Sequence, residues 1–388
     1  MLEKNRAFKF LDRLLDLCFL PLGPLARMRG APDRAPQDGD AILFIKLCCF
    51  GDTLLAWPAL HALKTKFPTS PLTVLASRRT APLFERFPMV DEVVTLPLSG
   101  TGGLREFLRF PSALRVLLRL VRHGFPVLID GDVHYRFLTP LGLFLGRRYR
   151  AGFDTLPGRA RFYSHKAERP RSEPEWRSFF RLFAPLGLRP DLTLPIRLHA
   201  NPAEIAAARN LLVAAPAGHL KVGIVAGASP NWPEKQWPAG HFSELMRRIS
   251  DQRPATFFLI GTKEELTLAR DLVNLYNRPG TTVNLAGKTP FALLAEVIRG
   301  LDLFISNDTG PMHLAALSGV PTLGIFGPTD ERKWSPPGNF TALRSTLACR
   351  PCYYLSRMPA CDHRRCLTDL RPETVVAAAL KMAEGKSI

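Results

Sequence analysis

Residues 306–311, Ser-Asn-Asp-Thr-Gly-Pro, combine the residue types of an anion-binding turn. An apolar run over residues 301–305 leads into this turn and a helical pattern leaves it, which predicts a strand, a tight turn and a helix N-terminus. Asp308 and Thr309 could cap that helix, and Gly310 lets a ligand approach the backbone closely. Unpaired N–H groups and the positive end of the helix dipole would then suit a phosphate. The alternative is an ordinary capped helix after a strand.

A carboxylate follows a second apolar run near the N-terminus. Residues 41–47 favour a strand, and Gly51 and Asp52 open a segment whose apolar residues recur at helical spacing. Asp52 could serve as a general base, or it could be no more than a helix cap. One phosphate-like turn and one carboxylate turn on the same chain predict a half that binds a donor and a half that binds an acceptor.

Both turns must be positioned by strands and helices, and the chain supplies them in alternation. Apolar runs that predict strands lie at residues 72–75, 126–130, 221–225, 256–261, 301–306 and 321–326. Helical patterns separate these runs, so the fold class is α/β, with parallel sheets that carry helices on both faces. A chain of 388 residues exceeds one hydrophobic core. We therefore expect an N-terminal extension over residues 1–38, an acceptor-side domain over 39–200 and a donor-binding domain over 201–388.

Four ordered segments resemble glycosyltransferase family 9, the lipopolysaccharide heptosyltransferase family. They are the Gly51-Asp52 turn, residues 227–238 with their Lys-x-Trp-Pro pattern, residues 306–316, and the Phe-Gly-Pro-Thr of residues 326–329. The resemblance implies two doubly wound Rossmann-like domains facing a cleft, the glycosyltransferase B-type fold. It also implies inverting, metal-independent transfer without a cofactor, from a nucleotide sugar, with ADP-heptose expected, to a lipopolysaccharide core or related glycolipid. The alternatives are another nucleotide sugar, or a non-catalytic nucleotide- or carbohydrate-binding module.

The chemistry of such a transfer needs a base for the acceptor hydroxyl and positive charge for the departing diphosphate. The resemblance makes Asp52 the catalytic base and brings Lys235 and His313 to the donor. Without it, Lys235 could be a surface lysine and His313 a structural histidine. The predicted donor-binding residues are Ser229, Lys235, Glu264, Glu265, Asp308, Thr309, Gly310, His313, Gly327, Pro328 and Thr329.

Two neighbouring acids and one loop complete the expected site. Glu264 or Glu265 matches the acid that the family places on the donor ribose, and the sequence does not separate the two. Trp237 is expected to pack and to orient the preceding lysine. The loop after residues 126–130 has polar side chains that could bind acceptor hydroxyls or acidic groups. The predicted acceptor-binding residues are Gly51, Asp130, Asp132, His134 and Arg136.

Seven cysteines raise the question of metals and disulfides. Four of them lie near the C-terminus, at positions 349, 352, 361 and 366, and the first pair has the spacing of zinc ligands. Reduced thiols are the favoured reading, with structural zinc and disulfides as alternatives. Cys48 and Cys49 are expected to pack before the Asp52 turn. No catalytic metal site is expected, and the chain has no His-x-x-x-His pair.

A net charge of +18 implies an acidic partner. Nucleic acid is not expected, because no nucleic-acid motif is present and the basic residues are dispersed. Residues 7–29 are amphipathic but carry charges and two prolines, so they fit neither a membrane-spanning helix nor a signal peptide. They could lie on a membrane surface or pack on the protein itself. We expect a cytoplasmic enzyme, peripheral on the cytoplasmic face of the inner membrane, where a lipid-linked acceptor is presented.

Overall fold

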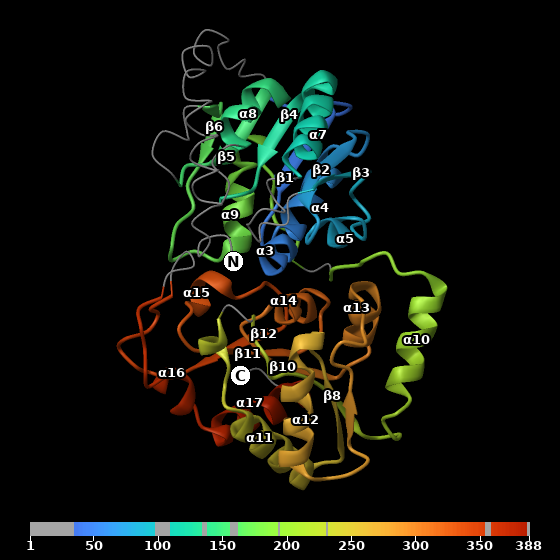
Figure 1. The fold of residues 1–388 in the computed structure, drawn as a ribbon, viewed down its shortest axis with the longest axis vertical. Coiled ribbons are helices and arrows are strands. Elements are labelled where there is room, and N and C mark those ends of the chain that lie inside the picture. The colour runs from blue at the N-terminus through green and yellow to red at the C-terminus, as the bar shows by residue number, and fades with distance from the viewer. Residues whose placement is uncertain are drawn as a thin grey trace. The chain divides into compact units, whose positions relative to one another are not determined.

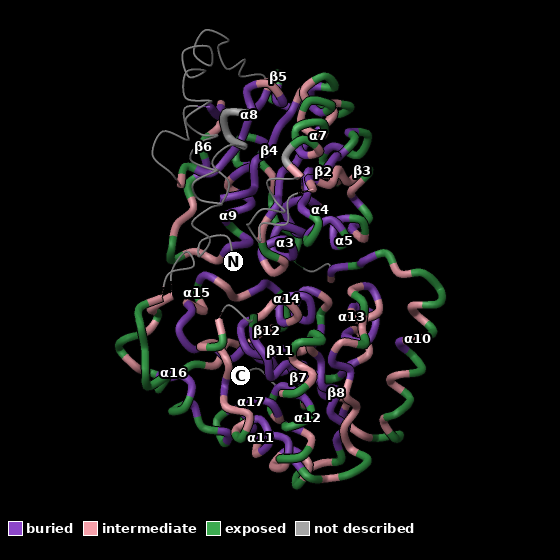
Figure 2. Tube along the Cα trace, viewed as in Figure 1, coloured by how far each residue is buried: buried purple, intermediate pink, exposed green. Residues whose placement is uncertain are grey.

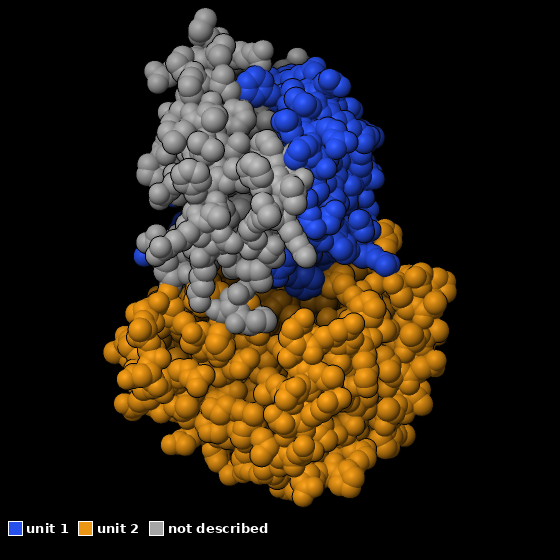
Figure 3. All heavy atoms as spheres, in the orientation of Figure 1, with its two compact units in different colours: residues 1–191 blue, residues 192–388 orange. Residues whose placement is uncertain are grey.

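The computed structural model describes residues 35–97, 109–133, 138–155, 162–192, 195–229, 232–353 and 358–385. Residues 7–29 therefore lie outside the described part. The chain forms two compact units, residues 1–191 and 192–388 (Figure 3). The sequence placed the boundary at residue 200, whereas the second unit begins with Leu192. It thus includes the linker before helix α10 (Pro202–Leu212), which packs against α13 (Phe291–Arg299).

Unit 1 is built on a six-stranded sheet in the order β3-β2-β1-β4-β5-β6, with every neighbouring pair parallel (Figure 1). Its strands are β1 (Ile42–Lys46), β2 (Leu72–Ser77), β3 (Glu92–Leu96), β4 (Phe125–Asp130), β5 (Gly146–Phe153) and β6 (His165–Ala167). All five residues of β1 are buried, because the central strand of a parallel sheet is covered on both faces.

The helices of unit 1 include two where the sequence pattern suggested one. They are α3 (Phe50–Leu55), α4 (Trp57–Lys66), α5 (Ala81–Phe84), α7 (Phe110–His123), α8 (Leu138–Leu145), α9 (Glu175–Arg181) and the short η4 (Ala184–Leu186). Ala56 separates α3 from α4, and Pro58 lies in the first turn of α4. Since proline has no N–H to continue a helix but fits a first turn, the chain restarts there.

Unit 2 repeats this architecture with a parallel sheet in the order β12-β11-β10-β7-β8-β9. Its strands are β7 (Leu220–Val225), β8 (Ala255–Leu259), β9 (Thr282–Asn284), β10 (Leu303–Asn307), β11 (Thr322–Phe326) and β12 (Phe340–Arg344). Counted along each unit, both sheets have the order 3-2-1-4-5-6 of a doubly wound fold. The predicted α/β class with two Rossmann-like domains is confirmed.

A buried apolar cluster joins the sheet of unit 2 to its outer helices (Figure 2). Besides α10 and α13, the helices are η5 (Pro233–Lys235), α11 (Ala239–Gln252), η6 (Lys263–Glu265), α12 (Leu266–Tyr276), α14 (Gly310–Leu317), α15 (Glu331–Trp334), α16 (Arg365–Thr368) and α17 (Pro372–Ala383). The cluster includes Leu245 of α11, Leu272 of α12 and Val375 of α17. No helix within the described ranges is long and apolar enough to span a bilayer.

The order of the strands fixes where ligands can enter each unit. Strands one and four lie side by side, and their following connections leave toward opposite sides of the sheet, which opens a crevice at the carboxyl ends. In unit 1 these strands are β1 and β4, and in unit 2 they are β7 and β10. Most of the predicted acceptor-side and donor-side residues lie at the carboxyl ends of these four strands, whereas Glu264 and Glu265 follow β8 and residues 327–329 follow β11.

Candidate functional site

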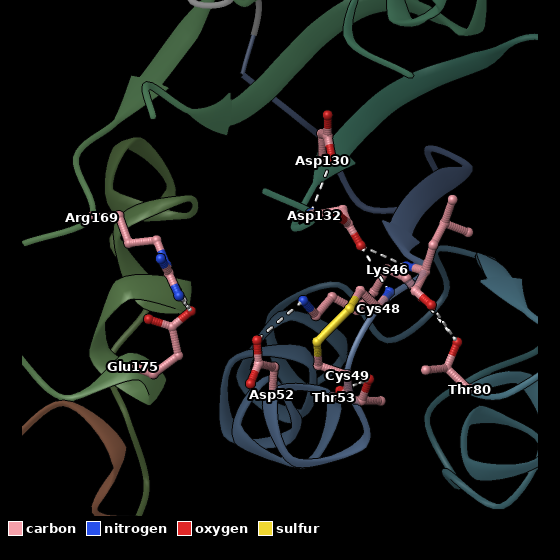
Figure 4. A network of polar contacts seen from close by, with 11 residues as sticks. Lys46, Cys48, Cys49, Asp52, Thr53, Thr80, Asp130, Asp132, Arg169 and Glu175 are labelled. Atoms are coloured by element: carbon pink, nitrogen blue, oxygen red, sulfur yellow. Dashed lines mark hydrogen bonds and ion pairs between the residues drawn. A yellow bond between two sulfur atoms is a disulfide. The ribbon is translucent and has the colours of Figure 1, made fainter. Parts of the chain in front are cut away.

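Asp52 lies in the first turn of α3, directly after the loop that follows β1. Cys49 precedes this helix with a left-handed backbone (φ 72°) and occupies the N-cap position, so Asp52 is not the capping residue. The residue is only 9% exposed, and its Oδ2 atom lies 3.8 Å from the Nζ atom of Lys46 (Figure 4). From the sequence, Asp52 could be a helix cap or a catalytic carboxylate. The structure excludes the capping role.

The surroundings of Asp52 make it a stronger base than an exposed aspartate. Burial raises the pKa of its carboxyl to about 6, with Lys46 and Arg169 acting to lower it and Glu175 and Asp132 to raise it further. Arg169 and Glu175 lie opposite, paired with each other at 2.8 Å (Figure 4). At neutral pH the carboxyl is therefore mostly ionised, yet it holds a captured proton more firmly than usual.

Two buried aspartates at the end of β4 hold the loop that carries Asp52. The Oδ2 atom of Asp132 accepts hydrogen bonds from the N–H groups of Leu47 and Cys48, each at 2.9 Å. Asp130 accepts from the N–H of Asp132 at 3.0 Å and from the hydroxyl of Tyr163. These contacts assign both carboxylates a positioning role within the fold, in addition to the acceptor contacts predicted for them.

Asp130 and Asp132 also form an Asp-x-Asp pair at a strand end, a spacing that the expectation of no metal site had overlooked. Their carboxylates are bonded to the backbone and to a tyrosine. Among the described residues, no group of three or more His, Cys, Asp or Glu side chains is arranged to hold a metal ion. Of the other predicted acceptor residues, Gly51 lies beside Asp52 in α3, whereas His134 and Arg136 fall outside the described residues.

Cys48 and Cys49, expected to be packed thiols, are joined by a disulfide directly before α3 (Figure 4). The hydroxyl of Thr53 donates to the carbonyl of Cys49 at 3.0 Å, and that of Thr80 donates to the carbonyl of Lys46 at 3.3 Å. The loop between β1 and α3 is thus held at both ends. The four C-terminal cysteines are free thiols.

In unit 2, Lys235 meets the strand-end turn that the sequence singled out. Its Nζ atom lies 2.9 Å from Oδ2 of Asp308 and 4.8 Å from the centre of the Tyr353 ring. Burial acts to raise the pKa of the Asp308 carboxyl, but the charge and hydrogen bond of Lys235, together with contributions from His313 and Thr329, hold the pKa below its usual value. Lys235 is therefore part of the predicted cluster, and Tyr353 is a neighbour that the sequence did not indicate.

The start of α14 is uncapped by side chains. Thr309 occupies the N-cap position, but its hydroxyl lies 2.9 Å from that of Ser306 and makes no cap hydrogen bond. Asp308 is engaged with Lys235 instead. Neither side chain therefore caps the helix, because Lys235 engages Asp308 and the neighbouring Ser306 engages Thr309. The first-turn N–H groups that follow, from Gly310 onward, keep the partial positive charge that suits an anion.

His313 is buried one turn into α14, with 4% of its surface exposed. Burial lowers the pKa of its imidazole to about 4, so the ring is neutral at pH 7. Its Nδ1 atom has no hydrogen-bond partner within the described residues. A buried, unsatisfied nitrogen beside a helix N-terminus is the arrangement expected where a ligand completes the hydrogen bonding.

Asn307 connects the two donor-side loops, a role that the sequence analysis missed. Its Oδ1 atom accepts from the N–H of Trp237 at 3.0 Å, and its amide donates to the carbonyls of Ala226 and Gly227. Trp237 is buried as predicted, and its indole N–H donates to the carbonyl of Leu370. The only signal in the sequence was the position of Asn307 at the end of an apolar run.

A small cavity at the carboxyl ends of β7 and β8 distinguishes Glu265 from its neighbour Glu264. Glu265 lines it together with Gly227 and Gly261, whereas Glu264 is exposed to solvent. Glu265 also accepts from the N–H of Thr262 at 2.7 Å, and burial raises the pKa of its carboxyl. Of the two, Glu265 is the one that a ligand in this cavity would meet.

The remaining donor-side residues divide between the surface and the interior. Ser229 is exposed, while residues 327–329 are buried. The carbonyl of Gly327 accepts from the guanidinium of Arg350, and that of Pro328 accepts from the N–H groups of Cys352 and Tyr353. This loop therefore anchors the C-terminal segment that brings Tyr353 to Lys235.

The chain is similar to known glycosyltransferases in both sequence and fold. A family model described as glycosyltransferase family 9 (heptosyltransferase) matches residues 140–358, more than half of the chain. Lipooligosaccharide heptosyltransferase 2 from Campylobacter jejuni subsp. jejuni serotype O:2 is 27% identical over 345 residues, which are 87% of this chain and 97% of that protein.

Solved structures show the same fold. The Escherichia coli ADP-heptose lipopolysaccharide heptosyltransferase II superposes with a TM-score of 0.67 at 19% identity, covering 89% of this chain and 99% of that one. A family 9 glycosyltransferase from Veillonella parvula gives 0.74 at 17% identity, over 91% and 100% of the two chains. The fold is of the glycosyltransferase B type and the chain is a glycosyltransferase, as the sequence motifs indicated. It belongs to glycosyltransferase family 9.

Proposed function

We propose that this enzyme transfers heptose from ADP-heptose to a lipopolysaccharide core or related glycolipid, with Asp52 as the general base. The observation that carries the proposal is the buried Asp52 carboxylate in the first turn of α3, just after β1, with its pKa raised to about 6. The relatives named above are heptosyltransferases, and the name of the Escherichia coli structure includes ADP-heptose. These names support this donor and acceptor over other nucleotide sugars and other glycans.

In the proposed reaction, Asp52 takes the proton of an acceptor hydroxyl as its oxygen attacks the anomeric carbon of the donor sugar. The bond from that carbon to the diphosphate oxygen breaks, and ADP leaves. A single displacement inverts the configuration at this carbon. The Lys235 ammonium and the first N–H groups of α14 would stabilise the charge that develops on the diphosphate. Because these groups supply positive charge, we propose that transfer needs no divalent cation.

The cavity in unit 2 supports the proposal that the donor is a nucleotide sugar. Glu265, at the carboxyl end of β8, would accept hydrogen bonds from the ribose hydroxyls, as acids after the second strand of doubly wound folds often do. His313 would complete its hydrogen bonding with the donor through its buried Nδ1 atom. Ser229 and residues 327–329 remain predicted donor contacts.

Helix α7 supports the proposal that the enzyme is peripheral on the cytoplasmic face of the inner membrane. Leu114 and Leu118 are 44% and 46% exposed one turn apart. Arg115, Arg119 and Arg122 are exposed on the same helix. Exposed leucines next to arginines suit the boundary of an anionic bilayer, where a lipid-linked acceptor would be presented.

The test is ADP release by the purified enzyme over a panel of nucleotide sugars, with and without deacylated core acceptors. Acceptor-dependent release from ADP-heptose is expected, lowered by about 10²-fold or more in Asp52→Asn. Asp154→Asn is the matched control, because Asp154 is an exposed carboxylate of the same unit. Activity should persist in EDTA, and NMR of the product should show the inverted anomer.

Other outcomes would separate the alternatives. If acceptor-dependent release of a nucleoside diphosphate occurs only with a different nucleotide sugar, that sugar is the donor in place of ADP-heptose. Full activity of Asp52→Asn would exclude Asp52 as the general base. Tight ADP binding without turnover on any donor or acceptor would favour the binding-module alternative.

A further inference from the structure

Lys46 is a lysine that the family motifs do not assign, and it is buried at the end of the central strand β1. Its side chain is 1% exposed. The residue is in register with Ala76 of the neighbouring strand β2. Removing an ammonium from water is costly unless a negative group compensates it. Every other residue of β1 is apolar, so an apolar side chain would also suit this position in the sheet.

Two contacts of the Lys46 ammonium show which group compensates its positive charge. Its Nζ atom lies 3.8 Å from Oδ2 of Asp52 and 5.8 Å from the centre of the Phe179 ring on α9. The ring contact is weak at this distance, whereas opposite charges at 3.8 Å in a buried site interact strongly. The Asp52 carboxylate is therefore the chief partner of the ammonium, and Figure 4 shows this ion pair.

The other charged groups that act on Asp52 also have partners of their own. Arg169, which precedes α9, and Glu175, its first residue, pair with each other at 2.8 Å. The Asp132 carboxylate after β4 accepts two backbone N–H groups. Among the described groups facing Asp52, Lys46 is thus the counter-charge that this carboxylate does not share with another acid.

We propose that Lys46 is a positioning residue that keeps the Asp52 carboxylate ionised and oriented toward the end of β1. The proposal rests on the function proposed above, in which Asp52 is the base. When Asp52 takes the acceptor proton, Lys46 loses its counter-charge, and this favours release of that proton to solvent. The lysine would thereby return the base to its active form after each transfer.

The first test follows the titration of Asp52 itself. Protein labelled with ¹³C at the aspartate carboxyls would be titrated by NMR, with the Asp52 signal assigned from its absence in Asp52→Asn. Lys46→Met should move the midpoint of this titration up by about one pH unit or more, because an opposite charge at this distance normally lowers an acid's pKa by that amount. Lys46→Arg should keep the midpoint near the wild-type value. An unchanged midpoint in a folded Lys46→Met protein would overturn the proposal.

The second test measures the same shift in the pKa of Asp52 through the pH dependence of catalysis. The acid limb of the kcat/KM profile should move to higher pH in Lys46→Met, so that activity at pH 6 falls about fivefold while the alkaline plateau changes less. Lys64→Met is the matched control, because Lys64 also pairs with an aspartate of unit 1, Asp91 at 2.8 Å. It should leave the limb in place.

The two proposals fail in different ways. If Asp52→Asn retains wild-type turnover, the base assignment is lost, and the NMR titration alone then decides whether Lys46 controls Asp52. If Lys46→Met does not fold, Lys46→Gln provides a second uncharged variant. The double variant Lys46→Met/Asp52→Asn, which removes both buried charges, should then fold better than Lys46→Met; equal instability would overturn the pairing.

Discussion

The ammonium of Lys235 lies 2.9 Å from a carboxylate oxygen of Asp308, and the two side chains are only 16% and 6% exposed. The pair places one positive group at the start of α14 without leaving a buried charge unmatched. A phosphate that approaches this helix would share the ammonium with Asp308. Under the proposed function, Lys235 would therefore have both a structural and a ligand-binding role.

Lys235→Ala should lose both roles. An unpaired Asp308 carboxylate is expected to destabilise the fold by about 3 kcal/mol and to repel the donor phosphates. Isothermal titration with ADP and thermal unfolding would measure the two effects. Lys235→Ala/Asp308→Asn should recover much of the stability but not the ADP affinity. Unchanged ADP binding in Lys235→Ala would remove this lysine from the site.

The pH dependence of turnover should report Asp52. Its pKa is raised to about 6 and the base must be ionised, so activity should rise as the pH rises through 6. Below that value kcat/KM should fall about tenfold per pH unit. Initial rates between pH 5 and 8 would show this limb, and a flat profile over that range would contradict the assignment.

His313 should make stability depend on pH in a defined direction. The pKa of its folded-state imidazole is lowered to about 4, below the 6.5 of an unperturbed histidine. The unfolded chain therefore binds more protons between these values, so stability is present above pH 6.5 and is lost as the pH falls toward 4.

The contribution of His313 could reach about 3 kcal/mol. Asp52 opposes it, because its raised pKa makes the folded state gain stability as the pH falls from 6 toward 3.8. Urea unfolding of the wild-type protein and His313→Asn across pH 4–7 would isolate the histidine. Parallel curves for the two proteins would disprove the effect.

Glu265 and Glu264 should differ in their effect on the donor. Glu265→Gln should weaken ADP binding about tenfold through the ribose contact, while its amide oxygen can still serve the helix cap. Glu264→Gln, an exposed neighbour, is the matched control and should bind ADP as the wild type does.

Gly227→Ala provides an independent test of the same cavity. An added Cβ would lie 1.8 Å from Oε1 of Glu265 and must displace that side chain. The substitution should therefore weaken ADP binding as Glu265→Gln does. Wild-type affinity in both variants would mean that the nucleotide lies elsewhere.

Helix α7 should contribute to membrane binding. Leu114→Ser/Leu118→Ser should reduce binding to vesicles of phosphatidylglycerol and phosphatidylethanolamine about tenfold, since two exposed leucines would no longer enter the interface. Leu275→Ser is the control, because Leu275 is equally exposed on α12. Equal loss in the control, or none in the double variant, would exclude α7 as the docking face.

The strands, helices and candidate site residues could be predicted from the sequence, whereas most contacts between them could not. Residues 221–225 and 301–306 read as buried strands because continuous apolar runs bounded by turns leave few alternatives, and they form most of β7 and β10. The Asp308 turn was found for the same reason. Its capping role was not predicted correctly, because a cap is a local contact and Lys235, a distant residue, competes for the carboxylate.

Contacts across long sequence separations explain most of what was missed. Asn307 bonds Gly227 from 80 residues away, and Trp237 bonds Leu370 across 133. Lys46 reads as an ordinary strand-end lysine until the sheet is assembled around it. No periodicity encodes such pairs, so they follow only from the packed fold.

Both sheets share one strand order, and each unit keeps its polar network at the ends of its own first and fourth strands. The residues proposed for the acceptor and those proposed for the donor therefore belong to separate structural units. Under the proposed function, substitutions that alter the choice of nucleotide or sugar would fall in the loops after β7, β8 and β10, and those that alter the choice of glycan would fall in the loops after β1 and β4. Recombination between family members at the boundary near residue 191 could exchange donor specificity while retaining Lys46, Asp52 and Asp132 as one inherited set.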